Sequence, residues 1–228
     1  MTEGMFDRAL PLFGEEGMER LARSRVALFG VGGVGGACAE ALVRGGVGHL
    51  TIVDGDVFTP SNLNRQRFAF RDGLGEPKAE YAARELERIS PSADIVAVNE
   101  YYSESSALDI SEFDYIVDAV DDLPAKITLV ERARAAGVPI VSSCGAGNKL
   151  DPARFRVADI YSTSVCPLAR ALRKACRDRG IPSLRVVYSD EPPAVRAATP
   201  ASVSFVPPAM GLVLASVVIR ELSGAGSI

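Results

Sequence analysis

Residues 26–56 constrain the fold more than any other stretch of this 228-residue chain. Val26–Phe29 is an unbroken apolar run, which is typical of a strand covered on both faces. Four glycines follow it directly: Gly30, Gly32, Gly33 and Gly35. A run of small residues and a second apolar segment come next, and that segment ends in Asp54 and Asp56. The order predicts a strand, a glycine turn, a helix and a second strand with an acidic tip.

This arrangement is typical of phosphate binding. Glycine allows a tight turn and lets a phosphate approach the backbone where a Cβ would block it. The helix that follows points its first N–H groups at that phosphate, and Asp54 stands where a ribose hydroxyl needs an acceptor. A glycine turn alone usually indicates a nicotinamide or flavin site, or a turn without any ligand, so the other motifs must decide.

The rest of the chain alternates between apolar runs and helical stretches, at 77–89, 95–98, 113–117, 123–136 and 138–142. Such alternation predicts an α/β fold: a Rossmann-like, doubly wound, mostly parallel sheet with helices on both faces. We expect a single domain over residues 1–228. Its nucleotide-binding core would be 1–148, and 149–228 would form a C-terminal α+β extension with a basic helix and an apolar terminal helix.

Composition narrows the function classes. The net charge of −4 argues against a protein coated by nucleic acid but permits a local basic patch. The start of the chain is unlike a signal peptide, and its longest apolar run, Ala209–Ile219, is short for a membrane span. Four cysteines include no Cys-x-x-Cys pair, and His49 is the only histidine. We therefore expect a cytoplasmic protein without a membrane partner, a zinc framework or histidine-based catalysis.

A loop after Asp56 is dense in hydrogen-bond donors. Arg65 and Arg67 can fork onto phosphate oxygens. The amide side chains can bond ribose or phosphate: Asn62, Asn64 and Gln66. A solvated loop would explain the polarity alone, but it would not explain why guanidinium and amide groups gather just after an acidic strand tip.

Lys78 follows Pro77 in the first turn of a predicted helix. The helix dipole disfavours a cation at this end, so a lysine here predicts a bound anion such as a triphosphate.

Three carboxylates cluster where the fourth predicted strand ends: Asp118, Asp121 and Asp122. They repel one another unless a cation or hydrogen-bond donors lie among them. Mg²⁺ shared between carboxylate and nucleotide phosphate is one solution. Capping of the next helix is the alternative, but it accounts for only one of the acids.

The predicted helix at 166–179 carries one acidic residue, Asp178, and five basic ones: Arg170, Arg173, Lys174, Arg177 and Arg179. Arg185 and Arg196 follow nearby. A charge run of this kind indicates either a solvated helix face or a surface that faces RNA, and the sequence leaves both open.

The order of motifs resembles the ubiquitin-activating-enzyme-like (ThiF/MoeB/HesA) adenylyltransferases, as seen in Gly30–Gly35, Asp54–Asp56, Ser61–Gln66, Gly75–Lys78 and Asp118–Asp121. The resemblance implies a site that binds ATP and Mg²⁺ and adenylates a carboxylate. It implies that the ATP site is lined by Gly33, Asp54, Asn64, Arg65, Lys78 and Asp121. It also implies that Asp121 is the residue that holds the Mg²⁺ ion. It also implies a homodimer in which Arg8 reaches the site of the neighbouring subunit, so that Arg65, Asp121 and Arg8 form the catalytic set.

A narrower resemblance, carried by residues 142–167, is to the tRNA threonylcarbamoyladenosine dehydratases. It implies ATP-dependent cyclisation of threonylcarbamoyladenosine in tRNA, with that tRNA as partner. Ubiquitin-type activators instead need a thioester cysteine. The candidates here are Cys144 and Cys166, which we interpret as structural because ring closure needs no thioester.

Two other classes stay open. Activation of a ubiquitin-like sulfur carrier would make a protein C-terminus the acceptor, and a cysteine desulfurase or sulfur acceptor would then be a partner. A nicotinamide oxidoreductase would bind NAD and would need neither Lys78 nor Asp121.

Overall fold

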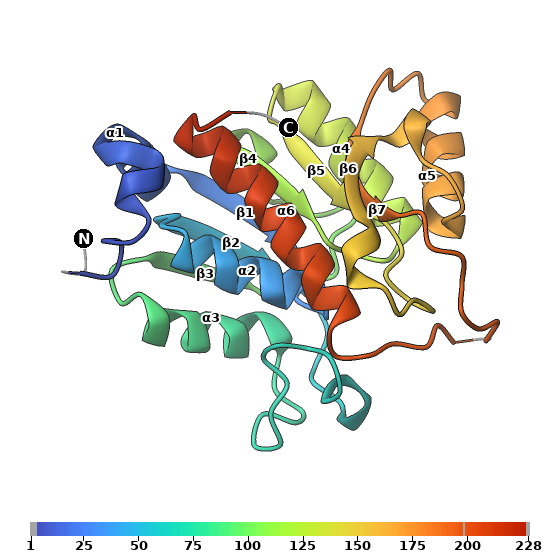
Figure 1. The fold of residues 1–228 in the computed structure, drawn as a ribbon, viewed down its shortest axis with the longest axis horizontal. Coiled ribbons are helices and arrows are strands. Elements are labelled where there is room, and N and C mark those ends of the chain that lie inside the picture. The colour runs from blue at the N-terminus through green and yellow to red at the C-terminus, as the bar shows by residue number, and fades with distance from the viewer. Residues whose placement is uncertain (1–3, 198, 227–228) are drawn as a thin grey trace.

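The computed structural model describes residues 4–197 and 199–226. These form one sheet of seven strands in the order β3-β2-β1-β4-β5-β7-β6 (Figure 1). The strands are β1 Arg25–Phe29, β2 His49–Val53, β3 Asp94–Val98, β4 Tyr115–Asp118, β5 Ile140–Ser143, β6 Phe155–Asp159 and β7 Arg185–Ser189. All neighbouring strands are parallel except β6, which runs antiparallel to β7.

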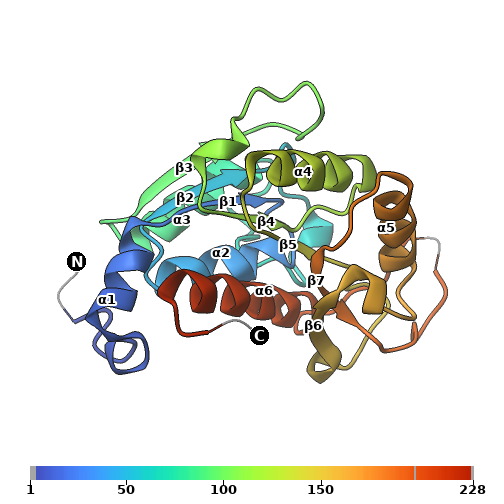
Figure 2. The same cartoon turned by 90° about the horizontal axis from the view of Figure 1, so that it is seen from above.

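Helices cover both faces of the sheet: α1 Leu10–Arg23, α2 Gly35–Arg44, α3 Lys78–Ile89, α4 Leu123–Ala136, α5 Pro167–Asp178 and α6 Val206–Ser223. α2 contacts α3 and α6, and α6 also contacts α1, whereas α4 contacts α5. Figure 2 shows α4 on one side of the sheet and α2 and α6 on the other. The predicted doubly wound fold is confirmed.

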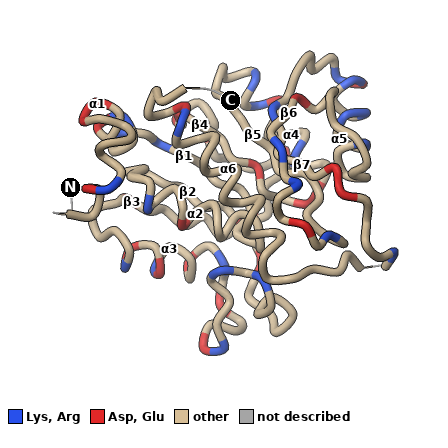
Figure 3. Tube along the Cα trace, viewed as in Figure 1, with Lys and Arg blue, Asp and Glu red and all other residues tan. Residues whose placement is uncertain are grey.

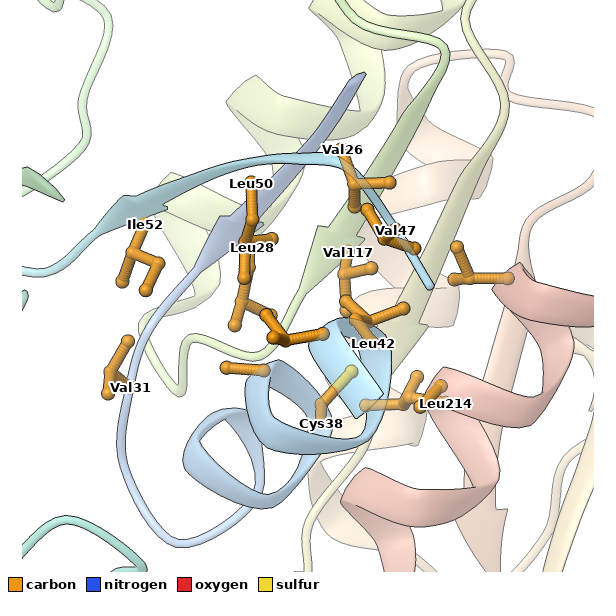
Figure 4. Packing of buried hydrophobic residues seen from close by; sticks show 14 of the residues in the cluster. Val26, Leu28, Val31, Cys38, Leu42, Val47, Leu50, Ile52, Val117 and Leu214 are labelled. Atoms are coloured by element: carbon orange, nitrogen blue, oxygen red, sulfur yellow. The ribbon is translucent and has the colours of Figure 1, made fainter. Parts of the chain in front are cut away.

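The unbroken apolar run in β1 is explained by burial on both faces. Val26 and Leu28 lie in the core cluster with Leu42 of α2 and Leu214 of α6 (Figure 4). Ala27 and Phe29 lie in the cluster on the opposite face, with residues of α4. Neither face meets water, so the strand shows no alternation of apolar and polar residues.

Strand β7 was not predicted. Its residues Val186–Tyr188 are a short β-branched and aromatic run, but our interpretation assigned the preceding Arg185 to a basic surface. β7 lies between β5 and β6 in the sheet. The sheet therefore includes strands from both the predicted core, residues 1–148, and the predicted extension, residues 149–228. The predicted extension is therefore part of the same sheet.

The apolar C-terminal helix belongs to the core. α6 has 18 residues with a mean hydropathy of 1.4, long and apolar enough by length and composition to cross a membrane. Half of that stretch is buried, and Met210, Leu214 and Val218 are fully covered. A Cβ on Gly211 would lie 2.1 Å from the Val34 carbonyl oxygen, which shows how closely α6 packs on the start of α2. This apolar terminal helix, which the sequence predicted, packs on the sheet.

Candidate functional site

The glycine turn follows β1 and packs against the residues just after β4. Gly30 has φ +88°, and a Cβ there would lie 2.8 Å from the Ala119 carbonyl oxygen. A Cβ on Gly35 would lie 1.8 Å from the Gly30 carbonyl oxygen. Within the described part of the chain, the N–H groups of Gly32 and Gly33 have no acceptor. Two free N–H groups at the start of α2 form a cradle suited to an anion.

Asp54, at the end of β2, is held against this cradle. Its carboxylate accepts hydrogen bonds from the N–H of Val31 at 2.6 Å and from the N–H of Asp56 at 2.8 Å. Burial raises the pKa of Asp54 above its usual value, although both hydrogen bonds oppose that shift. The carboxylate is thus fixed in place while part of it stays accessible.

Lys78 has an internal partner that the sequence did not reveal. Its Nζ lies 2.7 Å from Asp56 Oδ2, and the lysine is only 5% exposed. The hydroxyl of Tyr101, which is 72% exposed, donates to Asp56 Oδ1 at 2.7 Å. Burial alone would raise the pKa of Asp56, but the bonds from Lys78 and Tyr101 outweigh it and the pKa is lowered. The anion beside Lys78 in this structure is therefore a carboxylate, and the dipole argument alone does not require a bound phosphate.

Tyr101 is a residue of this edge that the sequence analysis missed. It follows the third strand, as Asp54 follows the second, and it is exposed although it is aromatic. A large aromatic residue just beyond a strand's carboxyl end was the available signal, because ligands bind outside that edge in open α/β sheets.

The donor-rich loop places Arg65 beside the cradle. A Cβ on Gly33 would lie 3.4 Å from Arg65 Cγ. Arg65 Nη1 donates to the Ser61 carbonyl at 2.8 Å and to Asn64 Oδ1 at 2.9 Å. Asn64 therefore orients the guanidinium group, and a terminal nitrogen of that group stays available for an anion.

The other amides of this loop divide between structure and site. The buried Asn62 accepts from the Thr59 N–H at 3.0 Å, so its carboxamide oxygen shapes the turn. Gln66 is 8% exposed, and its buried Oε1 has no partner within the described residues. An unpaired buried polar atom is costly, so the carboxamide oxygen of Gln66 is a hydrogen-bond acceptor that the described fold leaves unused.

Arg67 does not face the site as predicted. It forms an ion pair with Glu40 on α2, whose side chain also binds Arg44. This partner precedes Arg67 by 27 residues, so the local sequence does not indicate it.

The three carboxylates after β4 have three different environments. Asp118 is fully buried, and both of its oxygens lie 3.0 Å from Lys126 Nζ, which also donates to the Ser143 carbonyl at 2.8 Å. Asp122 caps α4 by accepting from the Ala125 N–H at 2.9 Å. Asp121 is exposed and has no partner among the residues described.

Two of the predicted ligand contacts need correction accordingly. Asp118 cannot meet a nucleotide in this structure because no part of its side chain is exposed. The carboxylate of Asp122 is used as a helix cap. Lys126 neutralises the buried Asp118, and among these three acids Asp121 has the carboxylate that is exposed and has no partner within the described residues.

Arg8 lies away from the other predicted site residues of its own chain. It is exposed in the turn before α1, and its neighbour Phe6 contacts the region of Gly46, just beyond the end of α2. The glycine cradle is at the opposite end of that helix (Figure 1). Arg8 is therefore remote from the glycine cradle of its own chain.

A segment that crosses from β7 to α6 borders the same edge. Asn148, with φ +60°, donates its N–H to the Ala201 carbonyl and accepts from the Ala201 N–H, both at 2.7 Å. The Asn148 carbonyl accepts from the Ala194 N–H at 2.8 Å, and Asn64 Nδ2 donates to the Ser202 carbonyl at 3.1 Å. Asn148 and Asn64 thus fasten the crossing segment, of which residues 190–197 and 199–205 are described, to the predicted ATP-site loop.

The substitution Asn148→Ala is expected to loosen the crossing segment. It removes the side-chain acceptor. It also leaves alanine at a positive φ, where its Cβ is strained and no side-chain hydrogen bond offsets the strain, which costs about 1–2 kcal/mol. Trypsin should then cut faster after the exposed Arg196. Asn148→Gly adopts the positive φ without strain and loses only the side-chain hydrogen bond. Its cleavage rate should therefore fall between those of the wild type and Asn148→Ala. Equal rates in all three proteins would show that Asn148 does not hold the segment.

The four cysteines are buried and unpaired: Cys38, Cys144, Cys166 and Cys176. Burial raises the pKa of the Cys144 thiol to about 12, so it is protonated at neutral pH. A protonated, covered thiol is a poor nucleophile. In the described part of the chain, no three His, Cys, Asp or Glu side chains are grouped so as to hold a metal ion.

The fold and this edge together define a Rossmann-like α/β protein with an anion cradle, an arginine and a free carboxylate at the carboxyl ends of its parallel strands. The chain belongs to the ThiF family, whose sequence profile matches residues 6–228. The predicted family resemblance is confirmed.

Comparison with individual proteins gives a narrower likeness. The chain is 36% identical over 238 residues to tRNA threonylcarbamoyladenosine dehydratase from Bacillus subtilis, covering 95% of this chain and 94% of that protein. It superposes on a crystal structure of the E. coli tRNA N6-threonylcarbamoyladenosine dehydratase in complex with ATP with a TM-score of 0.88 and 28% identity, over 96% of this chain and 94% of that one. The E. coli molybdopterin-synthase adenylyltransferase is 38% identical, but only over 131 residues, or 57% of this chain.

Proposed function

We propose that this protein is an ATP-dependent tRNA threonylcarbamoyladenosine dehydratase. The observation that carries the proposal is the convergence of a glycine cradle, Arg65 and the unpaired Asp121 at one edge of the sheet. The dehydratase from B. subtilis aligns with nearly the whole chain, including the β6–β7 region, whereas the molybdopterin-synthase adenylyltransferase matches little more than half of it.

In the proposed reaction, a carboxylate oxygen of the threonylcarbamoyl group attacks the α-phosphorus of ATP and pyrophosphate leaves. The carbamoyl group of the same substrate then attacks the acyl-adenylate, a ring closes and AMP leaves, with net loss of water. The N–H groups of Gly32 and Gly33, together with Arg65 and Lys78, would hold the triphosphate, and Asp54 would accept a ribose hydroxyl. These groups act by positioning and charge stabilisation rather than as a general base.

A magnesium ion fits the residues that are present. Mg²⁺ is commonly held by one or two carboxylates together with substrate phosphates and water, and Asp121 offers one exposed, unpaired carboxylate. When bound, the ion would neutralise charge on the phosphate oxygens. We assign its protein ligand to Asp121.

We also propose a cytoplasmic homodimer in which Arg8 of one subunit completes the site of the other. Arg8 lies beyond the end of α2, whereas the glycine cradle of the same subunit lies at the start of that helix, and this separation supports the arrangement. A mixture of an Arg8→Ala protein and an Asp121→Ala protein should regain activity in hybrid dimers, because such dimers contain one intact site.

The direct test follows AMP release by the purified protein with ATP and Mg²⁺. Three acceptors are compared: tRNA that carries threonylcarbamoyladenosine, the same tRNA without that modification, and a ubiquitin-like sulfur carrier. The proposal requires AMP release and loss of 18 Da from the nucleoside only with the modified tRNA. AMP release with the carrier alone would assign the protein to carrier activation, and uptake of NAD without ATP would overturn adenylation altogether.

Replacing Cys144 with alanine should leave this AMP release unchanged. The thiol is covered and protonated at neutral pH, and ring closure needs no enzyme thioester. Mass spectrometry of the wild-type protein under turnover should likewise show no acyl group on cysteine. Loss of activity with an unchanged melting temperature would instead make Cys144 a nucleophile.

A further inference from the structure

Helix α5 has two distinct sides. Ala169, Leu172 and Cys176 are buried against the second hydrophobic cluster. Arg170, Lys174 and Arg177 are exposed and follow the spacing i, i+4, i+7, so they share one face of the helix. We call these three residues the α5 basic stripe. Figure 3 shows the basic positions along the outer side of this helix.

The structure separates this stripe from the other basic residues that the sequence grouped with it. Arg173 donates to the carbonyl and the hydroxyl of Thr163 at 2.8 and 2.7 Å, and Arg179 pairs with Glu131 of α4 at 3.1 Å. Arg185 forms an ion pair with Glu221. Arg173 and Arg185 hold elements of the fold together, which corrects their place in the predicted basic surface. Arg179 is exposed and its pair with Glu131 is solvent-exposed, but it is directed toward α4 and not along the stripe.

The stripe residues have few anionic neighbours. Arg170 has no side-chain partner within the described residues. Arg177 lies over the ring of Tyr161, with 5.9 Å between its guanidinium carbon and the ring centre. Lys174 pairs with Asp178 at 2.6 Å, but its side chain is 76% exposed. An exposed pair of this kind is weak and can exchange for another anion at little cost.

The stripe begins at the site edge of the molecule. A Cβ on Gly145, which follows β5, would lie 3.3 Å from Cys166 Sγ, the residue just before α5. At the other end, Arg134 near the end of α4 donates to the Gly180 carbonyl at 2.9 Å. α5 therefore runs from the carboxyl edge of the sheet, where Asp121 lies, toward the opposite edge.

We propose that the α5 basic stripe binds the sugar-phosphate backbone of the substrate RNA next to the nucleotide that enters the site. The inference rests on the proposed function. The stripe spans about 10 Å along the helix, the length of roughly three nucleotides. The protein as a whole carries a net charge of −4, so a polyanion is attracted to a local cationic surface and repelled elsewhere.

The test neutralises the stripe in the full chain, as Arg170→Gln/Lys174→Gln/Arg177→Gln. Its matched control, Arg23→Gln/Arg25→Gln/Arg88→Gln, removes three exposed charges from α1, β1 and α3, and each of these arginines has a glutamate partner. A third variant, Arg170→Lys/Arg177→Lys, retains all three charges. Both the KM for modified tRNA and the salt dependence of tRNA binding are measured, with the KM for ATP as a reference.

The stripe variant should raise the KM for tRNA by about 10- to 100-fold and leave the KM for ATP unchanged. Losing three phosphate contacts should reduce the slope of log Kd against log salt by about 2–3. The control and the lysine variant should behave like the wild type. An unchanged tRNA KM in the stripe variant, or an equal rise in the control, would overturn the proposal, as would a loss of binding to a carrier protein and not to tRNA.

The experiment separates this proposal from the proposed function. If the wild type releases AMP with modified tRNA and the stripe variant does so with the same KM, only the RNA surface is wrong. If the wild type releases no AMP with tRNA, the proposed function fails. In that case a filter-binding assay tests the surface by itself. The proposal is supported if the stripe variant loses tRNA binding and the control retains it, and it is overturned if the two bind tRNA equally.

Discussion

Replacing Asp121 with alanine should abolish ATP–pyrophosphate exchange, with a loss of at least about 100-fold, the size seen when a group that stabilises transition-state charge is removed. Asp121 is the exposed and unpaired carboxylate after β4, so its removal breaks no contact within the described residues. The melting temperature should therefore stay close to that of the wild type. Measuring exchange with labelled pyrophosphate, ATP and Mg²⁺ isolates the adenylation step when the modified tRNA is present.

The neighbouring carboxylate provides the matched control. Asp122→Ala removes the cap of α4, which accepts from the Ala125 N–H, and should cost about 1 kcal/mol of stability. Exchange should nevertheless remain, because that carboxylate is used within the fold. Normal exchange in Asp121→Ala, or an equal loss in both variants, would refute the separate role of Asp121.

Lys126→Met should destabilise the protein by about 3–5 kcal/mol, because it leaves the buried Asp118 carboxylate without its cation. Both side chains are 0% exposed, and Lys126 also binds the Ser143 carbonyl, so this one ammonium joins β4, α4 and β5. Urea unfolding followed by circular dichroism would measure the loss. A loss of this size is a large share of the stability of an ordinary domain.

Two further variants show whether the loss comes from the unpaired charge. Asp118→Leu/Lys126→Met removes both charges and should recover much of the stability, since an apolar pair avoids the cost of burying ions. Lys174→Met breaks the exposed pair with Asp178 and should leave the unfolding midpoint unchanged. If Lys126→Met unfolds at the wild-type urea concentration, Asp118 is not held by this ion pair.

Much of the arrangement of the candidate site could be predicted because its parts are local. At Gly30 and Gly35 an added Cβ would clash with backbone atoms after β1 and β4, so the turn requires glycine. The short apolar run before the turn indicates a covered strand. Parallel strands bring their carboxyl ends to one edge, so Asp54, Arg65 and Asp121 were expected near one another. Here the order of the chain and the rules of parallel sheets were sufficient.

What the sequence left open was the partner of each charged side chain. Arg65 and Arg67 are two residues apart, yet one lies beside the cradle and the other pairs with Glu40 on α2. Arg185 looked like part of a basic surface, but it starts β7 and pairs with Glu221. Ion pairs depend on distance in space, and residues far apart along the chain become neighbours only when the sheet and its helices have packed.

The sequence by itself therefore determined the strand–turn–helix unit, the doubly wound sheet and the edge at which the site lies, because these follow from backbone geometry and hydrophobic pattern over a few adjacent residues. Only the tertiary structure decided which of Asp118, Asp121 and Asp122 is free, and which of the basic residues around α5 face solvent. The physical reason is that burial and pairing of charge are settled by groups that the fold brings together.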